Sequence, residues 1–385
     1  MTATEPHWRV VSAIGITQTL AWGSTYYLPA VLADPISDGL NLSRSWFFGI
    51  FSAALLLSGL LGPLAGRLID RHGGRDVLAA TNLVFAAGLA LLATATGPIG
   101  LVGGWLLLGA GMGFGLYEAA FATVTGLYGS KARSAITGIT LFAGFASTVG
   151  WPLSAFFNDA FGWRGACLAW AGLHLLIGLP LNRFLVPKTF LTVHATVAAP
   201  PKTGNVPWTM IVLAAVFGAT TFIAAAVSAH LPRMLEALGT TPTAAVALGA
   251  LIGPAQVTAR VIEFTLLRQA SPMLSAQLAA AMQLLAAILL VTLGAPVAAA
   301  FVILYGGGNG LLTIARGTLP LALFGPAGYG LRTGILAAPA RILQGGAPLA
   351  FGLVLDHGGS GSALILLAAL AGSSLVALLL LRSSS

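Results

Sequence analysis

The segment Gly62-Pro-Leu-Ala-Gly-Arg-Leu-Ile-Asp-Arg-His-Gly-Gly-Arg75 is the one compact block of charge in the first hundred residues. Long apolar segments flank it on both sides. A loop with this many basic side chains cannot lie in hydrocarbon, because charges inside a bilayer are costly. The block therefore predicts a short loop at one face of a membrane, joining two helices that cross it.

The composition excludes a soluble domain. Of the 385 residues, 57% are hydrophobic and 7% are charged, whereas a soluble domain has about 25% charged residues. Apolar windows of about 18 residues or more recur along the chain, and each can cross about 30 Å of hydrocarbon as a helix. The sequence predicts an all-α membrane protein whose surroundings are a lipid bilayer.

Several other classes of function lack the residues that they need. The net charge of +8 is not gathered into a patch, so we expect no nucleic-acid partner. Cys167 is the single cysteine, which rules out a disulfide framework or a Cys-based metal site. The glycine runs have no preceding strand and no following Gly-Lys-Ser/Thr, so they predict no nucleotide site. We expect no metal, no cofactor and, because no nucleophile–base set is present, no enzyme.

Twelve transmembrane spans are predicted, most of them joined by short connections. Their ranges are about 9–33, 45–69, 76–96, 99–127, 134–157, 163–186, 208–231, 243–266, 272–293, 297–323, 333–355 and 360–381. A Pro-rich polar segment divides them six and six. The sequence thus predicts a six-helix bundle at 1–186, a cytoplasmic linker at 187–207 and a second six-helix bundle at 208–385.

Lysine and arginine gather on one side of the predicted membrane. With the amino terminus inside, the inner side holds Arg9, Arg67, Arg71, Arg75, Lys131, Arg133, Arg183, Lys188, Lys202, Arg268, Arg332 and Arg382. The outer side holds Arg44, Arg164 and Arg233. Because basic loops stay in the cytoplasm, both termini are predicted to be cytoplasmic in a multi-pass protein of the inner (plasma) membrane. No cleavable signal peptide is expected.

The two halves of the chain carry similar patterns. Gly66-Arg-Leu-Ile-Asp70 ends the second span, and Ala259-Arg-Val-Ile-Glu263 ends the eighth. The fourth span contains Gly109-Ala-Gly-Met-Gly-Phe-Gly115, and the tenth contains Gly306-Gly-Gly-Asn-Gly310. Runs of glycine permit close packing and bending of membrane helices. Parallel repeats of this kind predict two pseudo-symmetric bundles.

The pattern Gly66-x-x-x-Asp70-Arg71-x-Gly73-x-Arg75 resembles the loop 2–3 signature of the major facilitator superfamily. Together with the twelve-span layout, the resemblance implies the major facilitator fold, whose two bundles rock about a central site. It also implies that this loop is gating machinery. Gly66 would allow close helix packing, and Asp70 would cap a helix end or pair with an arginine. Arg71 and Arg75 would hold the inner face.

The corresponding positions in the second half are Arg260 and Glu263. They lie three residues apart, so they can pair on one helix face. Because the internal match is contiguous, we assign both to a second gate. The alternative is a substrate role for Arg260.

A finer resemblance covers the fourth to sixth predicted spans. The run Gly109–Glu118, the basic loop at Lys131 and Arg133, and Phe161-Gly-Trp-Arg-Gly165 resemble the monocarboxylate-porter branch. The first span lacks the lysine that this branch usually has there. In the eighth span its aspartate is also missing, so proton coupling stays open.

Two arginines inside predicted spans are candidates for substrate binding. Arg341 lies near the middle of the eleventh span, with Gln344 one turn later on the same face. Arg316 falls on one helical stripe with Asn309 and Thr313 in the tenth span. A guanidinium can bind a carboxylate through two parallel hydrogen bonds. The alternative for Arg341 is a structural ion pair. The alternatives for Arg316 are an interior gating pair and a side chain that snorkels to the inner interface.

A polar and aromatic stripe in the first half is a candidate substrate wall. Gln18, Trp22 and Tyr26 lie four residues apart in the first span, and Tyr117 in the fourth is a further candidate. Tyr26 equally suits the outer aromatic belt of a membrane protein. Glu118 is either a proton carrier, if it is buried without a partner, or half of a salt bridge.

These residues predict a secondary active transporter that moves a small organic anion, monocarboxylate-like, by alternating access, with proton coupling left open. The prediction of an anionic substrate rests on the excess of arginines over acidic residues within the predicted spans. The first alternative is a proton-coupled exporter of multiple drugs or toxic compounds, and the second is a transporter-like ligand sensor. The protein is expected to act as a monomer. Its partners would be an anionic small molecule and the bilayer.

Overall fold

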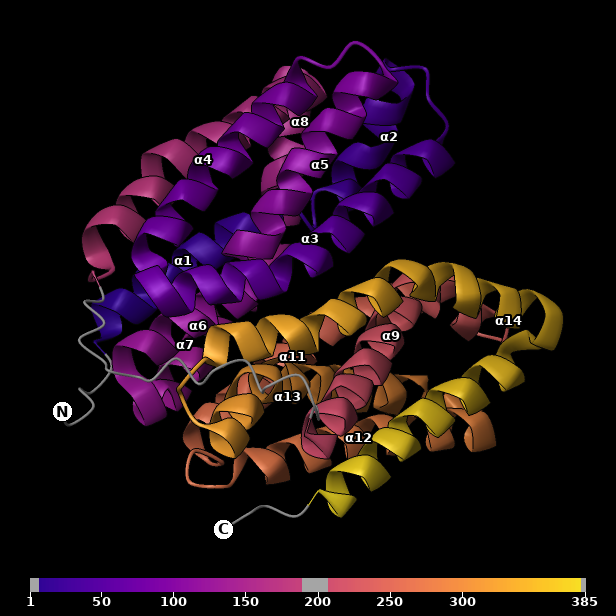
Figure 1. Cartoon of the computed structure of the whole chain (residues 1–385). Helices are drawn as coiled ribbons and strands as arrows, with labels where there is room; N and C mark the ends of the chain where they lie inside the picture. The colour runs from indigo at the N-terminus through magenta and orange to yellow at the C-terminus, as the bar shows by residue number, and fades with distance from the viewer. Residues whose placement is uncertain (1–6, 189–206, 382–385) are drawn as a thin grey trace. The chain divides into compact units, whose positions relative to one another are not determined.

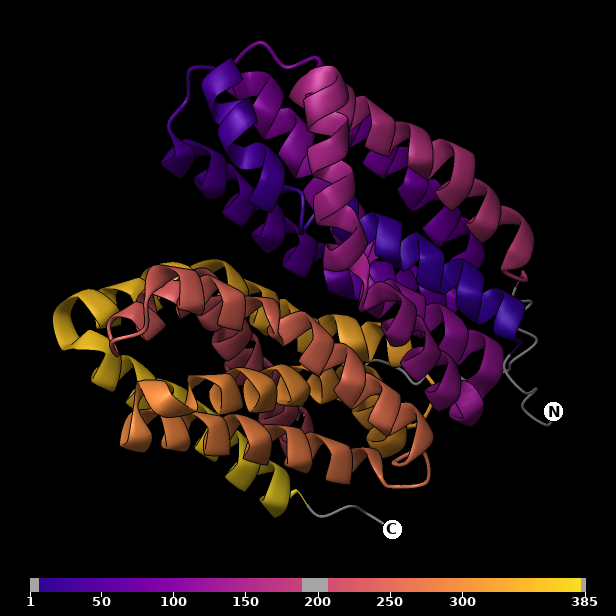
Figure 2. The same ribbon diagram turned by 180° about the vertical axis from the view of Figure 1, so that it is seen from behind.

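The computed structural model describes residues 7–188 and 207–381, and every regular element within these ranges is a helix (Figures 1 and 2). The first half contains α1 (Trp8–Ser24), α2 (Pro29–Gly39), α3 (Arg44–His72), α4 (Gly74–Ala93), α5 (Pro98–Gly115), α6 (Tyr117–Tyr128), η1 (Gly129–Ala132), α7 (Arg133–Ala143), α8 (Ala146–Leu173), η2 (His174–Gly178) and η3 (Leu181–Leu185). The second half contains α9 (Trp208–Glu236), α10 (Pro242–Ala250), α11 (Ile252–Thr265), α12 (Pro272–Leu293), η4 (Ala295–Val297), α13 (Ala298–Phe324) and α14 (Tyr329–Leu380). The prediction of an all-α protein is confirmed.

Seven helical stretches in the described residues are long and apolar enough to cross a membrane. Two of them are much longer than one crossing, at 88 and 52 residues. The chain turns inside these two at Gly162 and Gly359, whose φ angles of 68° and 72° suit glycine alone among ordinary residues. The helix bounds are consistent with the twelve predicted spans.

The described residues form two compact units. Unit 1 is the described part of Met1–Pro200 together with Phe324–Ala338, and unit 2 is the described part of Pro201–Leu323 together with Pro339–Ser385. Most of the predicted linker, with Lys202, and the terminal Arg382 lie outside the described residues. The predicted bundle boundaries stay a prediction.

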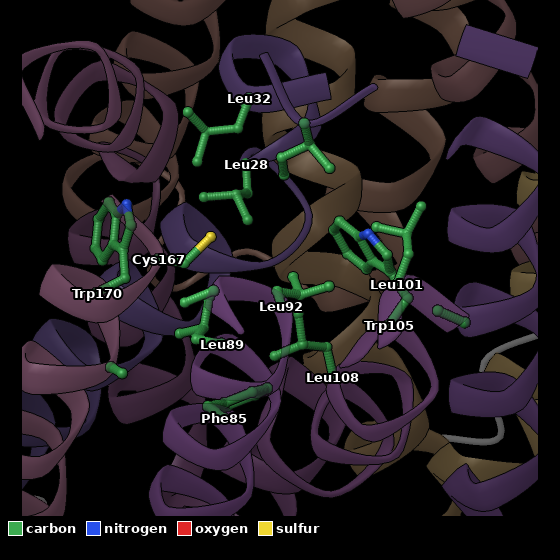
Figure 3. Packing of buried hydrophobic residues seen from close by; sticks show 14 of the residues in the cluster. Leu28, Leu32, Phe85, Leu89, Leu92, Leu101, Trp105, Leu108, Cys167 and Trp170 are labelled. Atoms are coloured by element: carbon green, nitrogen blue, oxygen red, sulfur yellow. The ribbon is translucent and has the colours of Figure 1, made fainter. Parts of the chain in front are cut away.

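Unit 1 is built around α5, which packs between α3 and α4, while α1 packs against α7 and α8. It contains a large apolar cluster, and Figure 3 shows Leu28, Leu89 and Leu92 gathered between the rings of Trp105 and Trp170. Unit 2 has its own core, which includes Leu290, Phe301, Tyr305 and Phe351. Each unit therefore buries a separate apolar centre.

The two glycine runs bring helices close together at matching places in the two units. A Cβ atom on Gly109 of α5 would lie 2.6 Å from the carbonyl oxygen of Ala54 in α3. In unit 2, a Cβ atom on Gly310 of α13 would lie 2.5 Å from the carbonyl oxygen of Gln256 in α11. No side chain fits at either place, so the predicted role of these glycines in close helix packing is confirmed.

Four of the predicted spans are interrupted. Their breaks fall at residues 25–28, between α1 and α2; at Leu116, between α5 and α6; at residues 144–145, between α7 and α8; and at Leu251, between α10 and α11. The first has a clear cause. Pro29 has no N–H group, and its ring would clash with the carbonyl of Thr25 in a continuous helix. In a membrane, such breaks are tolerated where protein or a water-filled cavity covers them.

Candidate functional site

The predicted gate motif joins α3 to the beginning of α14 within unit 1. The Asp70 carboxylate accepts hydrogen bonds from the backbone N–H groups of Gly330 and Leu331, both at 2.9 Å. It thus caps the first turn of α14, where N–H groups lack partners within the helix. Of the two roles implied for Asp70, the structure shows the helix cap.

Glycines bring the same two helices into backbone contact. A Cβ atom on Gly66 would overlap the carbonyl group of Gly330, and one on Gly330 would lie 2.6 Å from the Gly66 carbonyl oxygen. One helical turn away, a Cβ atom on Gly334 would lie 2.5 Å from the carbonyl oxygen of Gly62. The close packing implied for Gly66 is therefore present.

Replacing Asp70 with asparagine is expected to lower stability by about 1–3 kcal/mol, the cost of leaving one buried N–H donor without an acceptor. The amide keeps one acceptor but turns an N–H₂ group toward the N–H groups of α14. Thermal unfolding of the purified protein measures the loss. Asp38→Asn, at an exposed residue, is the control and should leave the midpoint unchanged. An equal midpoint for Asp70→Asn would show that the cap adds no stability.

The basic residues after Asp70 lie at the surface of unit 1. Arg75 and Arg183 both pair with Asp76, at 3.0 and 2.8 Å, and Arg71 is exposed. Exposed ion pairs contribute about 0–1 kcal/mol. These pairs link the start of α4 to η3 without adding much stability.

An aromatic surface lies where α1 and α5 end. We use this name for Trp22, Tyr26, Tyr27 and Tyr117, all of them half-buried. The Trp22 ring lies 5.4 Å from Tyr26, 6.2 Å from Tyr27 and 5.0 Å from Tyr117, measured between centroids. Three of the proposed substrate-wall residues, Trp22, Tyr26 and Tyr117, therefore come together.

Buried rings hold the aromatic surface in place from behind. Tyr117 stacks on Phe121 with an interplanar angle of 16° and 5.1 Å between centroids. Tyr26 contacts Phe51, which in turn meets Trp105 edge to face. Phe121 and Trp105 are buried, so the surface is anchored in the core of unit 1.

Gln18 supports the break between α5 and α6. Its side-chain amide donates to the carbonyl oxygen of Gly115 at 2.6 Å, a group at the end of α5 that no helical N–H reaches. Gln18 is 1% exposed, so its described role is to satisfy the backbone. Glu118 follows in the first turn of α6, next to Tyr117, and is half-buried.

In unit 2, two arginines converge on one face of α13. Asn309, Thr313 and Arg316 are half-buried among buried neighbours, which fits the predicted stripe. Arg316 donates to the Thr220 hydroxyl of α9 at 3.5 Å. Arg260 of α11 donates to the Thr313 hydroxyl at 3.4 Å. We call Thr220, Arg260, Thr313 and Arg316 the arginine strip.

Arg260 thus contacts a residue of the predicted substrate stripe, which the repeat argument did not foresee. It also donates to Gln256 at 3.3 Å. Glu263 accepts a hydrogen bond from the Ser275 hydroxyl of α12 at 2.7 Å. The gate assignment of Arg260 and Glu263 stays a prediction, and the structure adds a reason for a substrate role of Arg260.

Arg341 and Gln344 are brought together as the sequence suggested. The guanidinium donates to the Gln344 side-chain oxygen at 3.1 Å, and Arg341 is 8% exposed. Both lie in the unit 2 part of α14. Their site role stays a prediction.

Sequence reasoning missed a buried polar network in unit 1. His174 is fully buried; its Nδ1 lies 2.9 Å from the Asn82 side-chain oxygen and its Nε2 lies 2.8 Å from the Ser24 hydroxyl. Thr17 donates to the side-chain oxygen of Asn182 at 3.1 Å. Thr17 and Ser24 lie seven residues apart, and His174 and Asn182 eight. That helical spacing in apolar spans is the signal that could have revealed the network.

The family-model comparison matches the Major Facilitator Superfamily over residues 14–325. Among curated proteins, monocarboxylate transporter 11 of Mus musculus is 28% identical over 51% of this chain and 43% of that protein. Monocarboxylate transporter 3 of Rattus norvegicus is 32% identical over 44% of this chain and 34% of that protein. This chain therefore spans less than half the length of the curated relatives it matches.

Solved structures resemble the whole chain. The human organic anion transporter MFSD10 has a TM-score of 0.75 at 17% identity, covering 98% of this chain and 100% of that chain. The E. coli fucose:proton symporter FucP has a TM-score of 0.75 at 15% identity, covering 96% and 97%. Identities this low show the fold alone. With the family model matching most of the sequence, the chain belongs to the Major Facilitator Superfamily and is a membrane transporter, not an enzyme.

Proposed function

We propose that this transporter moves a small organic anion, of the monocarboxylate type, across the inner membrane by alternating access. The observation that carries the proposal is the arginine strip, in which Arg260 of α11 donates to Thr313 on the face of α13 that carries Arg316. Charged residues inside membrane spans usually face the pathway of a substrate or ion. The names of the similar monocarboxylate transporters and of the organic anion transporter support the same substrate class.

The chemistry of the strip suits a carboxylate. Arg260 and Arg316 donate to neutral hydroxyl oxygens at 3.4 and 3.5 Å, which are long hydrogen bonds. A carboxylate accepts hydrogen bonds from guanidinium groups at about 2.7–2.9 Å, and these bonds are roughly twice as strong as neutral ones. Arg341 with Gln344 forms a second candidate for anion binding in unit 2.

The contact between α3 and the first turn of α14 is the proposed gate. Asp70 and the paired glycines hold these helices together through two hydrogen bonds and a backbone contact, and water can take over the hydrogen bonds when the helices separate. Such a contact can open and close at low cost during a transport cycle, which is what alternating access requires. We propose a monomer with both termini in the cytoplasm, as the distribution of lysine and arginine indicates.

Transport by purified full-length protein in liposomes tests the proposal. Counterflow of labelled pyruvate and phenylacetate should exceed that of protein-free liposomes. The organic cation tetraphenylphosphonium should show no protein-dependent movement. Robust transport of the cation without either acid would overturn the anion proposal and leave the family assignment intact.

A proton-coupled exporter of multiple drugs or toxic compounds is the second candidate function, favoured by Glu118 next to the aromatic surface. If Glu118 carries the coupled proton, Glu118→Gln should abolish the dependence of transport on an imposed pH gradient. Transport driven by the substrate gradient alone should persist, because the variant keeps the shape of the side chain. Transport driven by the pH gradient and transport driven by the substrate gradient are measured in the same liposomes. An unchanged dependence on pH would overturn the proton-coupled exporter.

A further inference from the structure

Four rings of unit 1 meet where two helices are interrupted. Tyr26 and Tyr27 lie in the break between α1 and α2, and Tyr117 begins α6 directly after the break at Leu116. Trp22 lies in the last turn of α1 and contacts all three. Interrupted backbone inside a membrane needs protein or water around it. This aromatic surface therefore does not simply face lipid tails.

The burial of these rings differs from that of ordinary core aromatics in the same unit. Phe47, Trp105 and Trp170 are at most 1% exposed. Trp22, Tyr26, Tyr27 and Tyr117 remain half-buried although each touches other rings. Partly exposed rings, fixed from behind by buried ones, form a rigid surface that needs little reordering when a ligand binds.

The geometry of the rings suits the addition of another ring. Trp22 and Tyr26 meet at 71°, Tyr26 and Tyr27 at 84°, and Trp22 and Tyr117 at 45°. Edge-to-face and tilted arrangements of this kind are the favourable ones for aromatic pairs. A planar ligand ring can join such a cluster, whereas a saturated ring of the same size gains only its apolar burial.

We propose that the aromatic surface makes this transporter selective for organic acids that carry an aromatic ring. This inference rests on the proposed transport of organic anions and names the substrate class within it. The aromatic surface of unit 1 accounts for preference among acids of equal charge and similar size.

The test uses two acids that differ only in the ring. Phenylacetate and cyclohexylacetate carry the same carboxymethyl group, and both are ionised at pH 7.5 because carboxyl pKa values lie near 4. Binding to the full-length protein in lipid nanodiscs is measured by calorimetry, with empty nanodiscs as the background. We expect phenylacetate to bind about three- to tenfold more tightly, the contribution of a favourable aromatic pair.

Variants test whether the aromatic surface causes the preference for phenylacetate over cyclohexylacetate. Tyr117→Leu should bring the affinity ratio close to one while leaving cyclohexylacetate binding nearly unchanged, and Tyr117→Phe should keep the ratio. Phe157→Leu removes a half-buried ring that contacts Trp170 outside the aromatic surface, and it should also keep the ratio. Trp22→Leu repeats the test if Tyr117→Leu does not fold.

The possible outcomes separate this inference from the proposed function. Equal binding of the two acids by the wild-type protein would overturn the aromatic selectivity and leave anion transport standing. If the affinity ratio of phenylacetate to cyclohexylacetate were unchanged in both Tyr117→Leu and Trp22→Leu, the aromatic selectivity would also be overturned, because the preference would then arise elsewhere. Binding of neither acid would overturn both proposals.

Discussion

Gly66→Ala is expected to abolish transport and to lower the thermal unfolding midpoint by several degrees. The added methyl group would overlap the carbonyl group of Gly330, and neither backbone can move away without separating α3 from α14. Overpacking of this kind typically costs about 1–3 kcal/mol. The Asp70 cap on Gly330 and Leu331 would be stretched by the same separation. Liposome counterflow and thermal unfolding measure the two effects.

Other glycines of the same helix supply the controls. Gly49 in α3 has no atom within 4 Å of the position that a Cβ would take. Gly49→Ala should therefore leave transport intact and raise stability slightly, by about 0.5–1 kcal/mol, because alanine favours the helix. Gly62→Ala would place its Cβ 3.4 Å from the Gly334 carbonyl oxygen, an ordinary contact. If Gly66→Ala behaved like Gly49→Ala, the gate would not depend on backbone contact at Gly66.

The contact between α3 and α14 that we propose as the gate was the most predictable part of the molecule. Its residues are contiguous, and each has a physical reason that can be read locally. Gly66 removes a side chain where helices meet, and Asp70 offers a carboxylate at a helix end. What the local sequence could not supply was the partner. Gly330 and Leu331 lie 260 residues or more from Asp70. Because every residue except proline has a backbone N–H, the sequence does not indicate which N–H groups Asp70 binds.

The repeat predicted packing better than it predicted polar contacts. Gly109 on Ala54 and Gly310 on Gln256 are equivalent contacts in the two units, as glycine runs at matching positions suggested. Asp70 and Glu263 also match in sequence, yet one accepts from backbone N–H groups and the other from the Ser275 hydroxyl. Backbone packing depends on the absence of side chains, which a repeat preserves. A carboxylate, by contrast, binds whichever donor the surrounding helices present.

The pattern of apolar residues did not predict where the helices are interrupted. Hydropathy alone reads 99–127 as one span, because Leu116 is as apolar as its neighbours. At that break Gln18 of another helix satisfies the Gly115 carbonyl, and the apolar pattern of 99–127 contains no sign of this partner. Nor could spacing along one helix bring Arg260 to Thr313, since they lie on different helices. The aromatic surface and the arginine strip therefore emerge fully only in three dimensions.

Arg316→Gln is expected to weaken binding of phenylacetate by about ten- to one-hundredfold. A hydrogen bond to a charged group contributes about 1.5–3 kcal/mol, and the glutamine keeps polarity but loses the charge and the paired donors. Arg260→Gln should weaken binding to a similar degree. The double variant should lose less than the product of the two factors if both arginines hold one carboxylate, because residues that share a partner are not additive.

A matched control separates this direct role from the loss of one positive charge. Arg268 is exposed beyond the end of α11, so Arg268→Gln changes the net charge equally and should leave binding unchanged. Phenylacetamide, which has no charge, gives a second readout. The wild-type protein should prefer the acid strongly, and Arg316→Gln should reduce that preference by the same factor by which it weakens binding of the acid. If Arg341→Gln removed that preference while Arg316→Gln kept it, the carboxylate site would belong to Arg341 and Gln344, because the preference follows whichever guanidinium holds the anion.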